Sequence, residues 1–138
     1  MKSIDLDVKS STGIISVDED HQIIFNYIEK LQNIVNQPNN HEYAITILES
    51  FIAFFLEHTI KEEQLLQQYL PANIVDEHIL LHKNELNYLD ESLGVLKIKL
   101  SPNNIQTIAI QLNKEFENHI YRYDKYIMQK LIALQKAN

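Results

Sequence analysis

The sequence predicts an all-α fold, an up-down-up-down four-helix bundle preceded by an N-terminal arm. Over most of the 138 residues, apolar side chains recur every three or four positions, which is the period of an amphipathic helix. The chain has only two glycines and three prolines, whereas an all-β fold needs a turn signal about every ten residues. Because short links favour antiparallel neighbours, four such segments make the up-down bundle the default architecture.

The boundaries of the first two helices follow from start and stop signals in the sequence. The acidic residues Asp18–Asp20 suit the positive end of the first helix dipole, and Pro38 ends that helix because the residue before a proline avoids the helical region. Asn39-x-x-Glu42 resembles a capping box that opens the second helix. We expect a single domain, 1–138, with an arm over 1–17 and helices over about 18–37, 40–69, 72–97 and 102–134.

The last two helices have equally clear signals. Pro71 separates the second helix from the third. Gly94 either ends the third helix or lies within it, and the sequence leaves both alternatives open. Ser101-Pro102 combines a serine cap with a proline in the first turn, where the missing N–H does no harm.

Composition excludes several classes of function. With 12 basic and 19 acidic residues, the chain has a net charge of −7, which disfavours binding to nucleic acid and to anionic membranes. It has no cysteine, so disulfides, thiolate zinc sites and iron–sulfur clusters are excluded. The first residues have no apolar stretch of the signal-peptide type, and we find no apolar run long enough for a membrane span. We therefore expect a cytoplasmic protein.

The most informative feature is a set of histidines and carboxylates spread over all four predicted helices. Residues four apart on a helix lie on one face, so each four-residue pair can bind one metal ion. The four-residue pairs are His58 with Glu62 and His78 with His82. His119 and Asp124 are five residues apart, which is a rotation of about 140° on an ideal helix, so Asp124 either reaches sideways or lies in a locally widened π-turn. The candidate metal ligands are His21, His58, Glu62, His78, His82, His119 and Asp124.

A purely structural role for this set is disfavoured by energy. Burying seven polar groups without partners would cost roughly 1–3 kcal/mol each, which together would exceed the stability of a small domain. A metal site removes the contradiction.

The sixth histidine, His41, lies at a helix start and is expected to be exposed and not a ligand, and Asp18–Asp20 are expected to be a solvated helix start. Tyr123 and Tyr126 flank Asp124 and are candidates for supporting hydrogen bonds.

The number and type of donors favour two ions of a transition metal. Nitrogen and oxygen donors without sulfur suit iron, manganese or zinc, although structural zinc usually takes four ligands and often uses cysteine. Ferritin-type di-iron oxidases use Glu-x-x-His pairs, which this chain lacks. The histidine-rich set of this chain has less negative charge than the glutamate-rich set of those oxidases. If the metal is iron, fewer anionic donors favour the diferrous state, and therefore reversible binding of a ligand over oxygenation.

These motifs together resemble the hemerythrin family, in the single-domain bacterial form called bacteriohemerythrin. The motifs are Val17-Asp18-Glu19-Asp20-His21, His58-Thr59-Ile60-Lys61-Glu62-Glu63, Tyr69-Leu70-Pro71, His78-Ile79-Leu80-Leu81-His82, and His119-Ile120 with Asp124-Lys125. The resemblance implies a four-helix protein with two Fe ions that binds dioxygen reversibly. It also implies that His78, His82 and His119 hold one iron, that His21 and His58 hold the other, and that Glu62 and Asp124 bridge them, with an oxo or hydroxo group as the third bridge.

Some positions depart from the family pattern. Glu115 and Phe116 stand where the family often has Trp-Leu, and the resemblance implies that these two positions line the oxygen pocket. Thr59 replaces a frequent Phe, Leu66 a frequent Met, and Asp20 a frequent Gln. A carboxylate at the pocket would admit water and hasten autoxidation.

We expect an oxygen-binding protein for storage, delivery or sensing rather than an enzyme. The alternative is a di-iron redox enzyme or sensor that acts on peroxide or nitric oxide. A zinc-stabilised bundle is a further, purely structural alternative. The sequence does not identify a protein partner.

Overall fold

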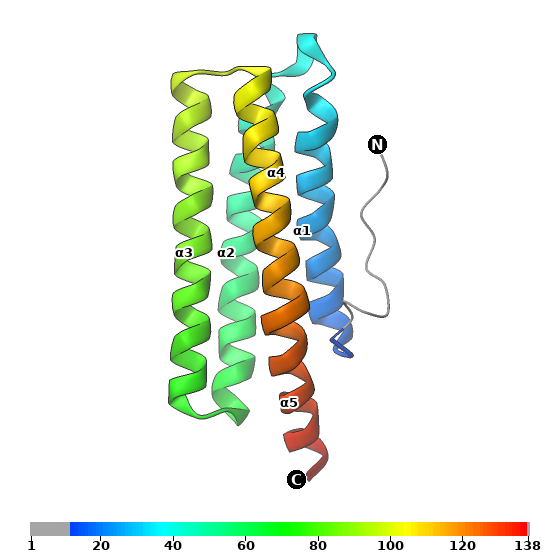
Figure 1. Cartoon of the computed structure of the whole chain (residues 1–138). Coiled ribbons are helices and arrows are strands. Elements are labelled where there is room, and N and C mark those ends of the chain that lie inside the picture. Colours follow the sequence, from blue (N-terminus) through cyan, green and yellow to red (C-terminus); the bar gives the residue numbers. More distant parts are fainter. Residues whose placement is uncertain (1–11, 138) are drawn as a thin grey trace.

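The computed structural model describes residues 12–137, and within them the chain is helical and contains no β-strand. The all-α prediction is therefore confirmed. Long helices lie side by side, and the last of these rods runs through α4, η2 and α5 in one line (Figure 1). The elements are α1 (Ile15–Ile34), the 3₁₀ turn η1 (Pro38–Asn40), α2 (Tyr43–Tyr69), α3 (Ala72–Ile98), α4 (Pro102–Asn118), the π-helical turn η2 (His119–Asp124) and α5 (Lys125–Ala137).

The start of α1 differs from the prediction. The helix begins at Ile15, three residues before the predicted start, and most of the predicted arm, residues 1–11, lies outside the described residues. Thr12 donates hydrogen bonds from its backbone N–H and its hydroxyl to Asp18 Oδ1, both at 2.8 Å. Asp18 therefore ties the incoming chain to the first turn, and Gly13 makes the bend with a φ of 86°, which favours glycine.

The predicted capping box at the start of α2 is wrong. Within the described part of the chain, no side chain caps this helix, and Glu42 already has helical dihedral angles, φ −61° and ψ −26°. Asn39 lies inside η1, not in the extended conformation that a capping residue needs. His41 is half-buried rather than exposed, because its Nε2 lies 3.1 Å from the carbonyl oxygen of Val35.

The starts of the later helices agree with the sequence signals. Ser101 is extended, and its hydroxyl accepts a hydrogen bond from the backbone N–H of Asn104 at 3.1 Å, so the predicted serine cap is confirmed. Pro102 occupies the first turn of α4. Gly94 lies within α3, which continues to Ile98, so the glycine does not end the helix.

The core is divided into two hydrophobic clusters along the bundle. In α1, for example, Val17 belongs to one cluster and Ile24 to the other, and His21 lies between them. In α2, His58 and Glu62 fall between Phe55 and Leu66 in the same way. Each of the four rods thus places polar side chains at the same level, as a layer between two apolar regions.

Helix α2 is long and apolar enough to span a membrane by length and composition alone. This is weak support for a span, since the core helices of soluble proteins pass the same test. Its buried face includes His58 and Glu62, which lie against the other helices. The prediction that no segment crosses a membrane stays a prediction.

Candidate metal centre

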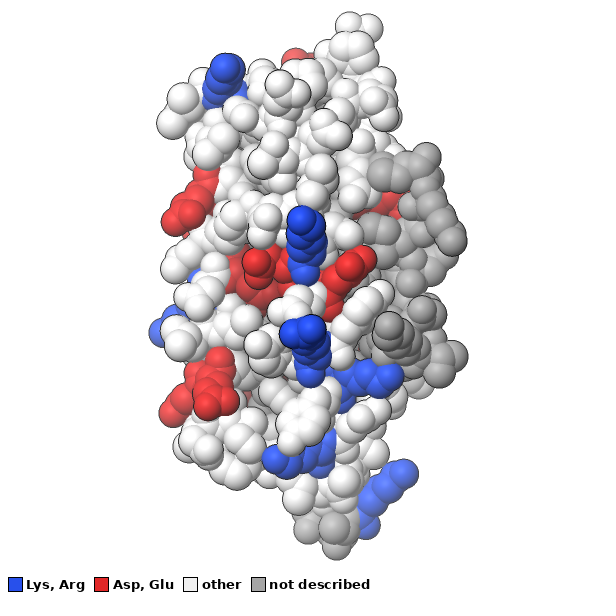
Figure 2. Space-filling model, viewed as in Figure 1, with Lys and Arg blue, Asp and Glu red and all other residues white. Residues whose placement is uncertain are grey.

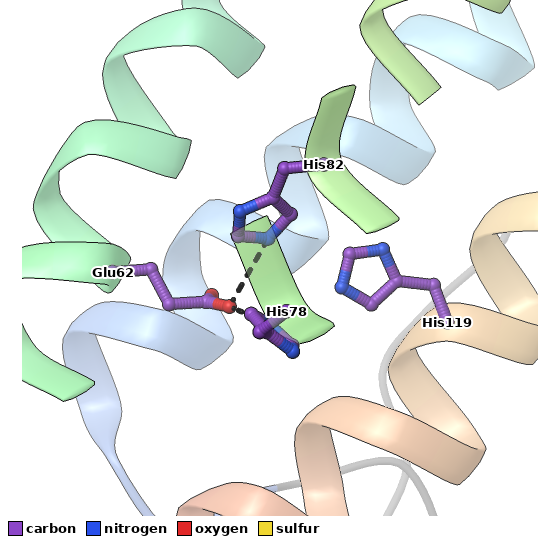
Figure 3. A group of neighbouring side chains, drawn as sticks. All are labelled: Glu62, His78, His82 and His119. Carbon is purple, nitrogen blue, oxygen red and sulfur yellow. Dashed lines mark hydrogen bonds and ion pairs between the residues drawn. The ribbon is translucent and has the colours of Figure 1, made fainter. Parts of the chain in front are cut away.

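The polar layer brings together all seven sequence-predicted ligands, none more than 2% exposed. They form two overlapping groups in which one donor atom from each residue lies within 4.8 Å of the others. The three-histidine group, drawn in Figure 3, consists of Glu62, His78, His82 and His119. The two-histidine group consists of His21, His58, Glu62 and Asp124. Each group could hold a metal ion, and Glu62 is common to both.

The two carboxylates each face both groups of histidines. Glu62 Oε1 lies 3.3 Å from His82 Nε2 and close to His78 Nε2, whereas its Oε2 lies 2.9 Å from His58 Nε2. Asp124 behaves in the same way: its Oδ1 lies 2.7 Å from His119 Nε2, and its Oδ2 lies 2.8 Å from His21 Nε2. One oxygen of each carboxylate therefore points to each group, as a carboxylate that bridges two ions would.

These spacings suit ligands of a common ion. Imidazole nitrogens and carboxylate oxygens lie about 2.0–2.2 Å from a bound transition metal, so neighbouring ligands at right angles are about 3 Å apart. His78 Nε2 and Asp124 Oδ1 are 3.0 Å apart, and the four pairs whose distances are given above range from 2.7 to 3.3 Å.

Several donor atoms at the centre face each other as nitrogen–oxygen pairs that form a hydrogen bond only when the ring nitrogen is protonated. Leaving such a buried atom unpaired costs roughly 1–3 kcal/mol. An ion coordinated by these lone pairs would remove that cost, so the donor set fits a pair of metal ions. The pairs are His21 Nε2 with Asp124 Oδ2 at 2.8 Å, His58 Nε2 with Glu62 Oε2 at 2.9 Å, and His82 Nε2 with Glu62 Oε1 at 3.3 Å.

The five-residue spacing of His119 and Asp124 is explained by η2. The sequence left open a sideways reach or a π-turn, and the structure has a π-helical turn over His119–Asp124. A π-turn closes i→i+5 hydrogen bonds, so residue i+5, here Asp124, returns to the face of residue i, here His119. The helix predicted over about 102–134 therefore contains a π-turn, one of the two alternatives, and this turn directs Asp124 toward the centre.

Three further carboxylates support the histidines from outside, and the sequence reasoning missed them. A carboxylate only accepts hydrogen bonds, so the Nδ1–H of each ring is the donor. His58 donates to Asp20 at 2.9 Å, and His82 donates to Glu63 at 2.7 Å. His119 donates to Glu85 at 2.6 Å. These bonds fix each ring so that Nε2 faces the centre, as metal-binding histidines require.

A periodic signal would have found Glu85. On α3 the first apolar residue after His82 is Leu86, but Leu86 is only half-buried and Glu85 is buried. A strict alternation of four and three residues from His78 reaches His82, Glu85 and Leu89.

Asp20 had been assigned to a solvated helix start, yet it binds both His58 and Lys61, whose Nζ lies 3.2 Å away.

The electrostatics of the metal-free centre couple the histidines to the carboxylates. Burial disfavours the charged ring of His58, but the hydrogen bonds with Asp20 and Glu62 outweigh burial and raise its pKa to about 9. The pKa of His78 is also raised to about 9, against burial, by Asp124 and Glu62. Burial raises the pKa of Glu62, but its histidine partners hold that pKa well below the usual value. Without metal, protons on these rings balance the carboxylates.

Other predicted side chains lie at the edge of the centre. Phe116 is buried, with its ring centroid 5.1 Å from that of Phe55 and 6.2 Å from that of His119. Glu115 is exposed and lines a surface pocket together with Phe116 and Glu85. The role of Glu115 and Phe116 in an oxygen pocket stays a prediction.

The two tyrosines beside Asp124 do not support the ligands. Tyr123 is 48% exposed and Tyr126 is 63% exposed, whereas the ligand side chains are buried. The supporting hydrogen bonds come from carboxylates instead.

Replacing Glu85 by glutamine is expected to weaken metal binding by about 10- to 100-fold. The amide oxygen can still accept from His119, but it no longer makes the imidazole a stronger donor. Competition with a coloured chelator measures the change. Glu91→Gln removes the same charge from an exposed position on α3 and should leave the affinity unchanged. Equal affinities for the two variants would show that Glu85 is only a packing residue.

Comparisons with known proteins found no matching family model, curated protein or solved structure.

Proposed function

We propose that this chain is a non-heme di-iron protein of the hemerythrin type that binds dioxygen reversibly, for storage, delivery or sensing. One observation carries the proposal. The two donor groups overlap at Glu62, and both Glu62 and Asp124 direct one carboxylate oxygen to the three-histidine group and the other oxygen to the two-histidine group. His78, His82 and His119 would hold one iron, and His21 and His58 would hold the other. Two ferrous ions would supply the electrons that a bound dioxygen takes up and returns.

The unequal donor sets suggest where a small ligand would bind. One side has three histidine nitrogens and the other has two, while both share the same carboxylates. An ion on the side of His21 and His58 would therefore keep a coordination position free, as in metal sites that bind small ligands.

Aromatic side chains keep bulk water away from the centre. Phe55 is fully buried, with its ring centroid 6.0 Å from that of His58 and 5.9 Å from that of His82. Phe116 packs against Phe55 and His119. A dry site supplies few protons from water, so a bound, reduced oxygen species is less easily protonated and lost. This favours release of the ligand as dioxygen.

The proposed fold includes the up-down-up-down order of the four rods. The links between α1, α2, α3 and α4 are short, and neighbouring rods lie side by side in Figure 1. Short links between helices that lie side by side support this order, since they leave no room for a chain that crosses the bundle between one helix and the next.

Metal analysis together with oxygen cycling tests the proposed function. We expect about two irons per chain, and an absorption band that forms when the reduced protein meets oxygen and bleaches under argon over repeated cycles. A protein that binds only zinc, or one in which oxygen irreversibly oxidises the iron in a single cycle, would contradict the proposal.

A di-iron redox enzyme or sensor for peroxide or nitric oxide is the second candidate. The carboxylates on His58, His82 and His119 favour it, because they increase electron donation by the imidazoles and stabilise oxidised iron. Sustained turnover of peroxide by the iron-loaded protein would support this candidate over the oxygen carrier.

A further inference from the structure

A surface pocket between α3 and α4 adjoins the three-histidine group. It has a volume of about 300 Å³, and its polar lining comes from Asn84, Glu85, Tyr88 and Glu115. Figure 2 shows carboxylates gathered at mid-height on this face, over α3 and α4. The pocket lies one residue away from the centre, because Glu85 at its wall holds the ring of His119.

Glu85 presents an unsatisfied oxygen. The side chain is only 4% exposed, and its Oε2 accepts from His119 at 2.6 Å. Its Oε1 is buried and has no hydrogen-bond partner among the described residues. A buried carboxylate oxygen without a donor is costly, and a cation in the pocket would pair with it.

The charged residues that line the pocket are negative. Glu115 also lines the pocket, and no lysine or arginine is found among the described residues that line it. Burial raises the pKa of the Tyr88 hydroxyl, and the charges of Glu115 and Glu91 raise it further. The pocket thus has two carboxylate residues in its lining, beside the polar residues Asn84 and Tyr88, and carboxylate oxygens suit a hydrated divalent cation.

The pocket on the opposite side of the centre has a different charge. It is only about 70 Å³ and touches His58 and Glu62, but Lys61 lines it and pairs with Asp20. A cation approaching there would meet the ammonium group of Lys61. The pocket beside Glu85 and the pocket beside Lys61 therefore differ in the sign of charge that they admit. A third pocket, of about 250 Å³, adjoins the first on the same side and is lined by His78 and Glu77, so that side of the centre is acidic as a whole.

We propose that the pocket between α3 and α4 is the uptake site for iron, where Glu85 and Glu115 bind hydrated Fe(II) before it passes to the buried centre. The inference rests on the proposed di-iron function. The ligands of the centre are at most 2% exposed, so an ion must first be captured outside it. Glu85 Oε2 holds the ring of His119, so an ion bound at Glu85 would lie beside a ligand of the centre.

The rate of iron uptake tests the proposal. Metal-free protein is mixed with Fe(II) without oxygen, passed through a desalting column at set times and analysed for iron. We expect Glu115→Gln to slow uptake at least about fivefold, since local carboxylates raise the arrival rate of cations by 10-fold or more. The final iron content should not change, because Glu115 is not a ligand of the centre. Glu115→Lys should slow uptake further.

Glu117→Gln is the matched control. It removes the same charge from α4, but Glu117 lines a different cavity and accepts a hydrogen bond from Asn113. We expect wild-type uptake from this variant. Uptake at the wild-type rate by Glu115→Gln and Glu115→Lys would overturn the proposal while leaving the di-iron function intact. A wild-type protein that takes up no iron would instead overturn the function.

A second measurement detects the site directly. Mn(II) is added to the iron-loaded protein, and free Mn(II) is counted by electron paramagnetic resonance. We expect one weak site in the wild type and in Glu117→Gln, lost in Glu115→Gln. Equal Mn(II) binding by the two variants would show that the pocket does not hold the cation.

Discussion

Replacing Glu62 by alanine is expected to abolish binding of both metal ions. Glu62 Oε2 lies 2.9 Å from His58 Nε2, and its Oε1 lies 3.3 Å from His82 Nε2, so one side chain serves both donor groups. Its removal takes a donor from each group and leaves a hole between them. After identical loading and desalting, iron should fall from about two per chain to nearly none, and the near-ultraviolet bands of a bridged iron pair should disappear.

Glu57→Ala is the control for this experiment. Glu57 is exposed on the same helix and carries the same charge, so its loss should leave the iron content at the wild-type level. A Glu62→Ala variant that keeps about one iron would show that the three-histidine group binds on its own and that Glu62 is not a shared ligand. Circular dichroism of both variants shows whether the helices persist.

The sequence contained enough information to predict the all-helical fold and the seven clustered side chains. Periodicity is a strong signal in long amphipathic helices, and His58 with Glu62, or His78 with His82, occupy positions on the inner face where the period would place apolar residues. Their burial follows from that phase alone. The structure confirms their convergence into groups that could hold a metal ion.

Local details were less accessible because they depend on competing conformations. Asn39 and Glu42 have the right residue types for a capping box, yet the chain forms a 3₁₀ turn instead, and spacing alone does not decide between the two. The π-turn was one of two open alternatives for His119 and Asp124, because a five-residue spacing does not say whether the backbone or the side chain adapts.

The supporting carboxylates were missed for a different reason. Asp20 is adjacent in sequence to a ligand, and a residue next to a ligand on a helix normally faces elsewhere. Asp20 reaches the centre only by contacting His58 on another helix, across 38 positions in the sequence. Contacts of this kind depend on how the helices pack, which periodicity within one helix does not contain.

Removing the metal is expected to lower the melting temperature by at least about 10 °C. An ion that binds the folded protein and not the unfolded chain stabilises the folded state by about 2.7 kcal/mol when its concentration is roughly 100 times the dissociation constant. A loss of about 3 kcal/mol would produce such a shift in a domain of this size. Thermal melts with and without a chelator measure it. The Glu62→Ala variant should not respond to the chelator, and a wild-type protein that melts equally in both conditions would contradict a metal-stabilised core.

The cost of metal removal should also grow with pH. In the metal-free protein the pKa values of His58 and His78 are about 9, above the ordinary 6.5, because the carboxylates outweigh burial. A raised pKa stabilises the folded state fully below 6.5, and this stabilisation is lost as the pH rises through 9. Metal-bound imidazoles are neutral throughout this range, so the loaded protein should change less. Melts of both forms between about pH 6.5 and 9.5 test this difference. Asp20→Asn removes a hydrogen bond that raises the pKa of His58, and it should flatten the pH dependence of the metal-free form. A flat profile in the wild-type metal-free protein would show that these rings are not protonated beside Glu62 and Asp124.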